Sequence, residues 1–177
     1  MTGPLTVVLY PHARCSFSEV DMSNVQSLLR DPRFLESGIA RLRCYDGGEP
    51  IIEEGSDERA VYLIRSGCVR VFERIELEDQ RQIKPGICDL GEGEVFGELS
   101  LLESGPRLAT VVTIEPTEVL VFDAELLVEY LDETPEFGYL LLKELFGVVT
   151  CRLRQTDRRL GSLFAWGLKA HGIDQHL

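Results

Sequence analysis

Histidine and clustered cysteine, on which most metal sites and many catalytic sites depend, are scarce in this chain. The 177 residues contain three histidines, His12, His171 and His176, all near the ends. The five cysteines are scattered, and none belongs to a Cys-x-x-Cys pair. Because metal sites need several such ligands at short spacing, we expect no metal site. No histidine accompanies a candidate nucleophile, so the chain is not predicted to be an enzyme.

Positive charge and long hydrophobic runs are also scarce. Lysine and arginine total 18 against 30 aspartates and glutamates, a formal net charge of −12. Duplex nucleic acid needs a basic face, and we expect the small basic cluster at residues 152–159 to be a solvated helix face. The apolar run over residues 5–10 is too short for a membrane span or a signal peptide. We therefore expect neither nucleic acid nor membrane as a partner, and the scattered cysteines favour a reducing, cytoplasmic setting.

Short β-branched or alternating runs, separated by glycine turns, fill the middle of the chain. Seven or eight such runs at this spacing are typical of an antiparallel jelly roll, which we expect over residues 40–123. Ser66–Gly67 fits a hairpin turn between two of them. The chain is 44% hydrophobic and is long enough to bury a core. The runs cover residues 41–45, 50–53, 60–64, 68–75, 82–90, 109–115 and 118–122.

Helical patterns flank the strands, so the predicted class is mainly β with helices on either side. Residues 1–39 form an N-terminal extension with short helices expected over 21–29 and 34–39. Asp31–Pro32 is expected to end the first of these, because the residue before proline avoids the helical region.

The C-terminal part, residues 124–177, is predicted to be helical. Asp123 is a side-chain cap for a helix through about Leu131. Thr134–Pro135 begins a longer helix over about 135–160, with Gly161 as its end. Its apolar stripe, expected by default to pack on the sheet, consists of Phe137, Leu141, Leu145, Val148 and Leu153.

The chain is organised around residues 96–112, where a lone acid, a short apolar turn and an arginine follow a glycine. Gly97 lets the backbone approach a ligand without a Cβ in the way. Free N–H groups at the start of the short helical turn attract anions, and Arg107 can grip a phosphate with its fork of donors. Glu98 repels phosphate but can accept hydrogen bonds from a sugar hydroxyl. One acid and one arginine placed in this way indicate a nucleotide, although the two could instead form a salt bridge between two turns.

This stretch resembles the phosphate-binding cassette of cyclic-nucleotide-binding domains, and residues 96–112 are called the cassette below. That family includes the catabolite activator protein and the regulatory subunits of cyclic-AMP-dependent protein kinase. The resemblance extends over about residues 40–159 and implies a double-stranded β-helix followed by C-terminal helices. It implies that Glu98 accepts the ribose 2′-hydroxyl and that Arg107 and nearby N–H groups hold the cyclic phosphate. The ligand-binding positions it implies are Gly97, Glu98, Leu99, Ser100, Arg107, Leu108 and Ala109.

The resemblance also concerns the long helix and the base. In the family this helix covers the base and forms the dimer interface, which implies a homodimer and makes Arg152 and Gln155 candidates for capping the base. Leu108 departs from the alanine, serine or threonine usual beside the arginine. A hydroxyl there can meet the amino group of guanine, so Leu108 favours cyclic AMP over cyclic GMP. It is also large enough to crowd the base.

These observations bear on three candidate functions, one of which they argue against. The first is a regulatory protein that binds cyclic AMP and signals to a separate effector protein. The second is a transcription factor of the catabolite activator type, which we reject because only 18 residues, 160–177, follow the long helix and a helix-turn-helix needs more. The third is an interaction module that keeps the fold and has lost its ligand.

Overall fold

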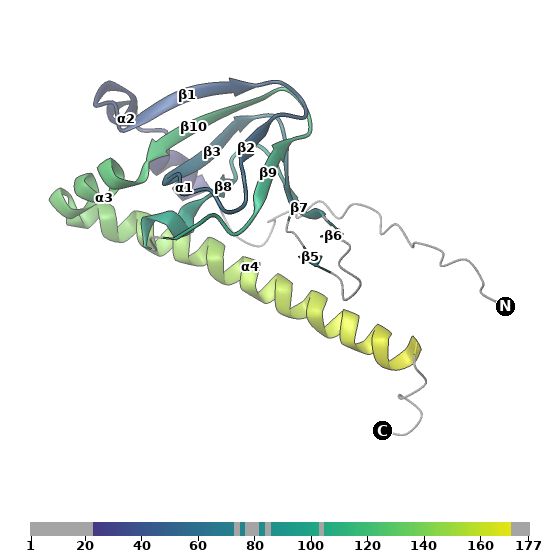
Figure 1. Cartoon of the computed structure of the whole chain (residues 1–177). Helices are drawn as coiled ribbons and strands as arrows, with labels where there is room; N and C mark the ends of the chain where they lie inside the picture. The colour runs from purple at the N-terminus through teal and green to yellow at the C-terminus, as the bar shows by residue number, and fades with distance from the viewer. Residues whose placement is uncertain (1–22, 73–74, 77–81, 84–85, 103–104, 171–177) are drawn as a thin grey trace.

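The structure, a computed structural model, describes residues 23–72, 75–76, 82–83, 86–102 and 105–170. The apolar run at residues 5–10 and the three histidines lie outside these residues. Two four-stranded antiparallel sheets, in the orders β1-β10-β3-β8 and β2-β9-β4-β7, face each other as a β-roll (Figure 1), which confirms the predicted fold. Their strands are β1 Ala40–Tyr45, β2 Pro50–Ile52, β3 Ala60–Ser66, β4 Val69–Phe72, β7 Gly86–Leu90, β8 Val95–Phe96, β9 Thr110–Thr113 and β10 Thr117–Asp123.

Two of the predicted runs are each divided in the structure. The run at residues 68–75 ends as β4 at Phe72, and Ile75–Glu76 forms a separate strand, β5. The run at residues 82–90 divides into β6, Gln82–Ile83, and β7. Among the described residues, strands β5 and β6 pair with each other as a two-stranded extension of the roll.

The central strands β3 and β10 are buried on both faces, because helices cover the outside of their sheet. Tyr62 and Val121 point into the roll, where they belong to the core between the two sheets. Their neighbours Leu63 and Phe122 point the other way, into a second core shared with the helices. Strand β3 therefore reads as a continuous apolar run rather than an alternating one.

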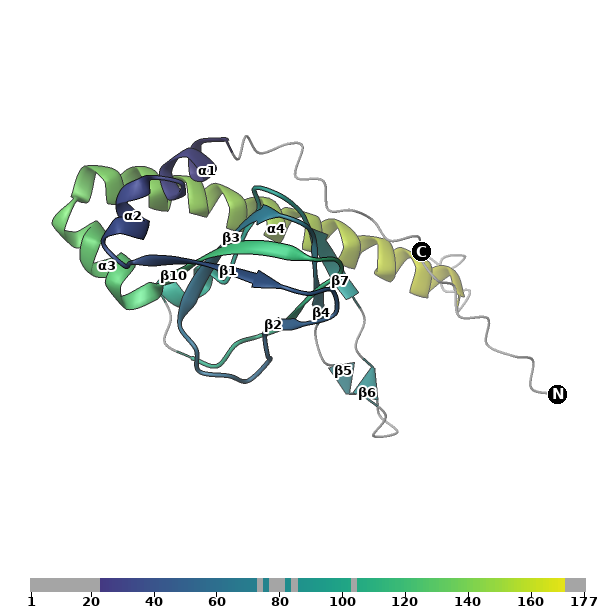
Figure 2. The ribbon, with the colours of Figure 1, turned by 90° about the horizontal axis from the view of Figure 1, so that it is seen from above.

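Short helices close the open side of this second core. They are α1 Ser23–Leu29, α2 Pro32–Glu36 and α3 Ala124–Glu133. Asp31 caps α2 by accepting from the Arg33 N–H at 2.9 Å, so Asp31–Pro32 begins a helix as well as ending one. Asp123 caps α3 as predicted, accepting from the Glu125 N–H at 3.0 Å. Figure 2 shows α1 lying alongside α4, which it contacts.

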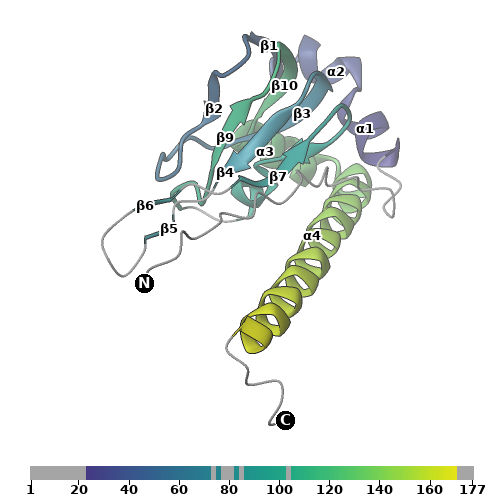
Figure 3. The same ribbon diagram turned by 90° about the vertical axis from the view of Figure 1, so that its right-hand side faces the viewer.

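Helix α4, Pro135–Ala170, is longer than the sequence predicts. Its 36 residues run through Gly161 without interruption, so the predicted break there is wrong. A lone glycine costs a helix only about 1 kcal/mol relative to alanine, and its neighbours are mostly good helix formers. The roll rests on the first part of α4, and the rest extends beyond it (Figure 3).

The apolar residues of α4 divide between two faces. Leu141, Leu145 and Val148 are buried against the helical core, as predicted. Leu153 was predicted to continue this stripe, but 60% of its surface is exposed. The packed stripe therefore ends near Val148, where polar residues take its place.

Candidate functional site

The cassette's tight turn depends on Gly97, which joins β8 to a short 3-10 helix, η1 (Glu98–Leu101). Gly97 has a φ of +76°, which side-chain-bearing residues rarely adopt. A Cβ at this position would lie 2.7 Å from the Ala60 carbonyl oxygen and 3.1 Å from Arg107 Nη1. Glycine is therefore required both by the backbone conformation and by the close approach of β3 and Arg107.

A cavity of about 520 Å³ opens between the cassette, the interior of the roll and α4. This volume is within the usual range of small-molecule sites. Its inner wall is apolar and comes from the strands, with residues such as Ile52, Val71, Leu90 and Val111. All nine residues selected from the sequence line the cavity: Gly97, Glu98, Leu99, Ser100, Arg107, Leu108, Ala109, Arg152 and Gln155.

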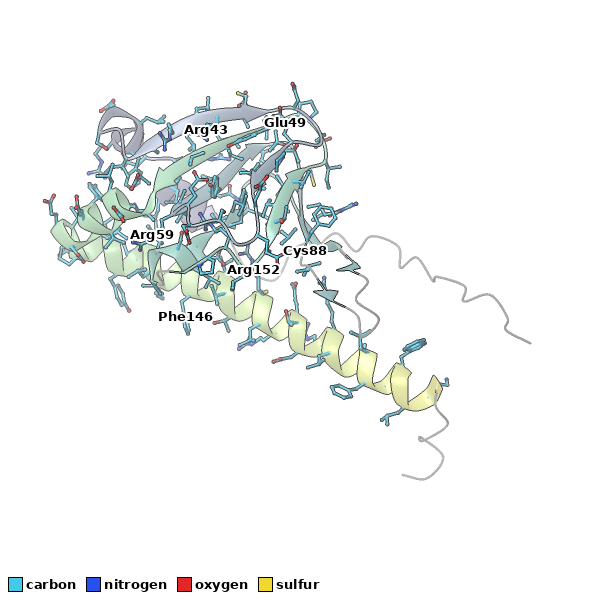
Figure 4. The ribbon with its side chains drawn as sticks, in the orientation of Figure 1. Arg43, Glu49, Arg59, Cys88, Phe146 and Arg152 are labelled. Carbon is cyan, nitrogen blue, oxygen red and sulfur yellow. The ribbon has the colours of Figure 1, made fainter. Side chains whose placement is uncertain are left out.

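Glu98 is paired with Arg152, which reaches it from α4. Only 8% of Glu98 is exposed, and its Oε1 accepts from Arg152 Nη1 at 2.6 Å. Arg152 Nη2 also donates to the Val95 carbonyl oxygen. Figure 4 shows Arg152 on the side of α4 that faces the roll. The alternative in which Glu98 and Arg107 form the ion pair is therefore wrong, and Arg152 instead ties α4 to the cassette.

Arg107 is half-buried and is held by main-chain oxygens. Its Nη2 donates to the Ala60 carbonyl at 2.7 Å, and its Nη1 donates to the Gly97 carbonyl at 3.3 Å. Its Nε is buried and has no hydrogen-bond partner among the residues that the structure describes. A buried donor without an acceptor is costly, so the guanidinium sits in the cavity wall with part of its donor capacity unused.

The other cassette residues line the cavity in different ways. The Ser100 hydroxyl lies 2.7 and 3.1 Å from two main-chain carbonyl oxygens, so its single proton is used within the fold. Leu99 and Leu108 line the cavity and are 44% and 70% exposed. Ala109 is half-buried and directly precedes β9.

Helix α4 contributes two further residues, Thr156, which the sequence analysis missed, and Arg159, which it assigned to a solvated basic face. That assignment is wrong for Arg152 and Arg159, because both donate hydrogen bonds to the roll. Thr156 and Arg159 line the cavity together with Arg152 and Gln155. Arg159 Nη1 donates to the Ile87 carbonyl oxygen at 2.7 Å, forming a second tie between α4 and the roll. These four positions are spaced at i, i+3, i+4 and i+7, which puts them on one helix face. The same spacing, counted onward from Arg152, would have identified them from the sequence.

Glu94 is a second carboxyl group near Arg152. Burial raises the pKa of Glu94 to about 7, although the Gly91 N–H and the Arg152 guanidinium both act to lower it. Its Oε2 accepts from the Gly91 N–H at 2.6 Å, whereas its Oε1 is buried and has no hydrogen-bond partner in the described part of the chain. The turn before the cassette therefore holds a group that titrates near neutral pH.

The described part of the chain contains neither a metal-ligand cluster nor a helix suited to a bilayer. No three histidine, cysteine, aspartate or glutamate side chains described by the structure are grouped closely enough to hold a metal ion. Within the same residues, no helix combines the length and the apolar character that crossing a bilayer requires.

Comparison with known proteins gives one matching family. The profile of the cyclic nucleotide-binding domain matches residues 42–134. This range begins within β1 and contains the strands from β2 to β10, the whole cassette and α3.

Similar proteins include sensors and kinases. The cyclic AMP receptor protein of Thermus thermophilus is 37% identical over 121 residues, which are 68% of this chain and 52% of that protein. The cGMP-dependent protein kinase egl-4 of Caenorhabditis elegans is 40% identical over 83 residues, 46% of this chain and 10% of the kinase. The crystal structure of the Thermus thermophilus catabolite activator protein superposes with a TM-score of 0.59 at 31% identity, covering 77% of this chain and 62% of that one. The chain thus spans about half the length of the receptor protein it matches.

Proposed function

Because the chain belongs to the cyclic nucleotide-binding domain family, we propose that its cavity binds cyclic AMP and that binding regulates a separate partner protein. One observation carries this proposal. Glu98 can accept from a sugar hydroxyl and Arg107 can bind a phosphate, and both line the same cavity between the cassette and α4.

The cyclic phosphate would lie against Arg107. A guanidinium has five N–H donors, and only two of the contacts of Arg107 are to carbonyl oxygens. The remaining N–H donors on its two Nη atoms match the oxygens of a phosphate, and such charge-assisted contacts are stronger than neutral ones. Main-chain N–H groups near Gly97, Leu99 and Ala109 would add donors, as in other anion-binding turns.

The ribose would lie between the phosphate and α4. Glu98 uses Oε1 to pair with Arg152, and its second oxygen can accept the 2′-hydroxyl. Arg152 compensates the buried charge of Glu98, which would otherwise be costly to hold out of water. Arg152 is thus expected to act both as the partner of Glu98 and as a residue near the base.

The purine would face the apolar inner wall and the polar face of α4, where Gln155 and Thr156 supply hydrogen-bonding groups. Relatives named for cyclic AMP and for cyclic GMP both match this chain, so the choice of base rests on Leu108. Leu108 offers no hydroxyl to the amino group of guanine, which favours cyclic AMP.

A second copy of the chain is the partner proposed for the outer face of α4. Phe146 on that face points away from the roll (Figure 4) and is 72% exposed. Alternating three- and four-residue spacing is the heptad pattern of a coiled coil, and a sustained apolar stripe of this kind is buried when two such helices pair. The stripe, called the outer seam below, consists of Tyr139, Leu142, Phe146, Val149, Leu153, Leu160 and Leu163, and the heptad position between Leu153 and Leu160 is taken by Thr156, which lines the cavity instead.

Substitution of the outer seam tests the homodimer. Leu153→Glu places a charge in the seam and is expected to give a monomer in analytical ultracentrifugation, since burying an unpaired charge is unfavourable. Leu140→Glu is the matched control, because Leu140 is 49% exposed on the same helix but lies off the seam. A wild-type protein that stays monomeric at high concentration, or a Leu153→Glu variant that remains a dimer, contradicts this partner.

Regulation would act through α4, because one of its faces is bonded to the cassette through Arg152 and another carries the outer seam. A ligand shifts an equilibrium only by its difference in affinity between two arrangements. Cyclic AMP contacts both the cassette and α4 when α4 is docked, so it favours the docked arrangement. An effector protein would then distinguish docked from undocked α4.

Isothermal titration calorimetry with cyclic AMP and cyclic GMP tests the binding itself. We expect saturable binding that is tighter for cyclic AMP. Arg107→Ala is expected to weaken it by more than about tenfold, because a charge-assisted contact is worth about 1.5–3 kcal/mol. Arg65→Ala, an exposed arginine of β3 outside the cavity lining, is the control and should bind as the wild type does.

Absence of nucleotide binding would favour the alternative of an interaction module that keeps the fold and has lost its ligand. If neither nucleotide gives heat or a thermal shift at millimolar concentration, the chain is an interaction module without this ligand. If Arg107→Ala binds as tightly as the wild type, Arg107 does not hold the phosphate.

A further inference from the structure

Tyr62, whose ring lies against Arg107, is one of two stacked aromatic rings. Tyr62 of β3 and Phe96 of β8 are paired across the sheet, and their ring centroids are 4.8 Å apart with planes only 4° from parallel. Both rings are buried, with 1% and 3% of their surface exposed. Phe96 lines the cavity, whereas Tyr62 is not among the lining residues. Tyr62 is therefore the inner ring of the stack.

The guanidinium of Arg107 lies over the inner ring. Its Cζ is 5.8 Å from the centroid of the Tyr62 ring, within the range over which a cation is attracted to the negative face of an aromatic ring. Its two carbonyl contacts come from Ala60, two residues before Tyr62, and from Gly97, which follows Phe96. The same two strands therefore supply both the ring and the oxygens that hold Arg107.

The packing leaves the guanidinium little freedom to leave the ring. A Cβ on Gly97 would lie 3.1 Å from Tyr62 Cδ2 as well as 3.1 Å from Arg107 Nη1. Gly97 therefore fits closely against both the ring and the guanidinium. A carbonyl acceptor on each side and an aromatic face between them fix the direction of the remaining N–H donors.

We propose that Tyr62 is a positioning residue for phosphate binding, which holds the Arg107 guanidinium in place through its ring face without touching the ligand. The inference rests on the proposed function, since it concerns the phosphate contact of that site. A preorganised arginine loses less conformational entropy when it binds, so removal of the ring should weaken binding even though no ligand contact is lost.

The phenol hydroxyl is not needed for this role. Burial, with a smaller contribution from Glu58, raises the pKa of Tyr62 to about 12. The ring therefore stays neutral over the ordinary pH range, and its attraction for Arg107 does not change with pH there. A phenylalanine ring at position 62 has the same face and should serve nearly as well.

Calorimetric titration of the full chain with cyclic AMP tests the proposal through three variants. Tyr62→Leu is expected to weaken binding by about tenfold, and Tyr62→Phe should restore affinity to within about threefold of the wild type. In an Arg107→Ala background, Tyr62→Leu should have almost no further effect, because contacting residues that act together are non-additive. Phe122→Leu is the control, since it removes a fully buried ring from the neighbouring strand β10 and should leave the affinity unchanged.

A graded series protects the test against misfolding of Tyr62→Leu. Phenylalanine analogues with increasing ring fluorination at position 62 keep the ring's size while reducing the negative potential of its face. The affinity should fall stepwise along the series, and the melting temperature of each variant reports whether it is folded.

The outcomes separate the inference from the proposed function. A wild-type protein that binds no cyclic nucleotide overturns both. A wild-type protein that binds while the fluorinated series keeps a constant affinity overturns the role of Tyr62 alone. The same conclusion follows if Tyr62→Leu weakens binding equally in the presence and absence of Arg107.

Discussion

The two faces of helix α4 differ in every property that matters for function. The face toward the roll is first apolar, with Leu141 and Val148 buried in the core, and then polar, with Arg152 and Arg159 donating to the roll. The outer seam is exposed except at the half-buried Val149 and carries large apolar residues such as Phe146. One face is thus packed and hydrogen-bonded within the chain, whereas the other leaves large apolar side chains exposed.

This difference shows how one rigid helix can link ligand binding at the cavity to a change in the position of the outer seam. The polar part of the inner face lies at the cavity, and the outer seam runs along the same stretch of helix. Any displacement of α4 caused by the ligand therefore moves the seam as well. Contacts of the inner face set the position of α4 on the roll, and the outer seam is the surface that α4 presents to another protein.

The largest expected effect on the free energy of unfolding comes from truncating the apolar part of the inner face. Leu141→Ala removes a side chain with no exposed surface and should lower the free energy of unfolding by about 3 kcal/mol, since a cavity is left in a packed core. Urea denaturation followed by circular dichroism measures this change.

Leu140→Ala is the neighbouring control for that measurement. Leu140 is 49% exposed, so its truncation should change the free energy of unfolding by less than about 1 kcal/mol. Similar losses for the two variants would mean that α4 is not docked on the roll by the face described here.

The second effect concerns the polar part of the inner face. Arg152→Ala leaves the buried Glu98 without its partner and should cost about 2 kcal/mol of unfolding free energy. The exposed Arg154, two residues on, is the control, and Arg154→Ala should be near neutral. In a double-mutant cycle, Glu98→Gln and Arg152→Ala should couple by at least about 0.5 kcal/mol. Additive effects would show that the pair contributes nothing to docking.

The smallest expected effect on the free energy of unfolding comes from Glu94, and it depends on pH. The pKa of Glu94 is raised to about 7 in the folded chain, from 4.5, so the folded state holds the proton more tightly than the unfolded state. This favourable contribution is complete below pH 4.5 and is lost as the pH rises through 7. Because the group is only partly buried, the loss is expected to be about 1 kcal/mol.

Glu94→Gln removes this titration. The variant should be more stable than the wild type at pH 8, and the difference should shrink toward pH 5. Glu92→Gln is the control, since the Glu92 side chain is 68% exposed, and should show no such trend. Parallel stability curves for wild type and Glu94→Gln would contradict the raised pKa. Denaturant titrations at several pH values give these curves.

The sequence was informative where local rules decide the structure. Glycine turns and alternating runs predicted the strands, and Asp123 was identified as a helix cap because its side chain acts on the next residues. Gly97 and Arg107 could be selected because their chemistry is visible in their order along the chain. These features depend on neighbours a few positions apart.

Features that depend on distant residues were harder to predict. Gly161 does not end α4, because one unfavourable residue cannot stop a helix whose other residues favour it. The partner of Glu98 was misassigned as a possible Arg107, since the pairing with Arg152 arises only when α4 docks. Leu153 could be assigned to a face only once the direction of α4 on the roll was known.

Hydrogen–deuterium exchange with and without saturating cyclic AMP tests the central claim most directly. The account predicts increased protection in two segments, residues 96–109 of the cassette and residues 148–159 of α4, with β1 unchanged as an internal reference. Protection confined to other segments, or no change in either segment, would contradict a cyclic nucleotide site between the cassette and α4.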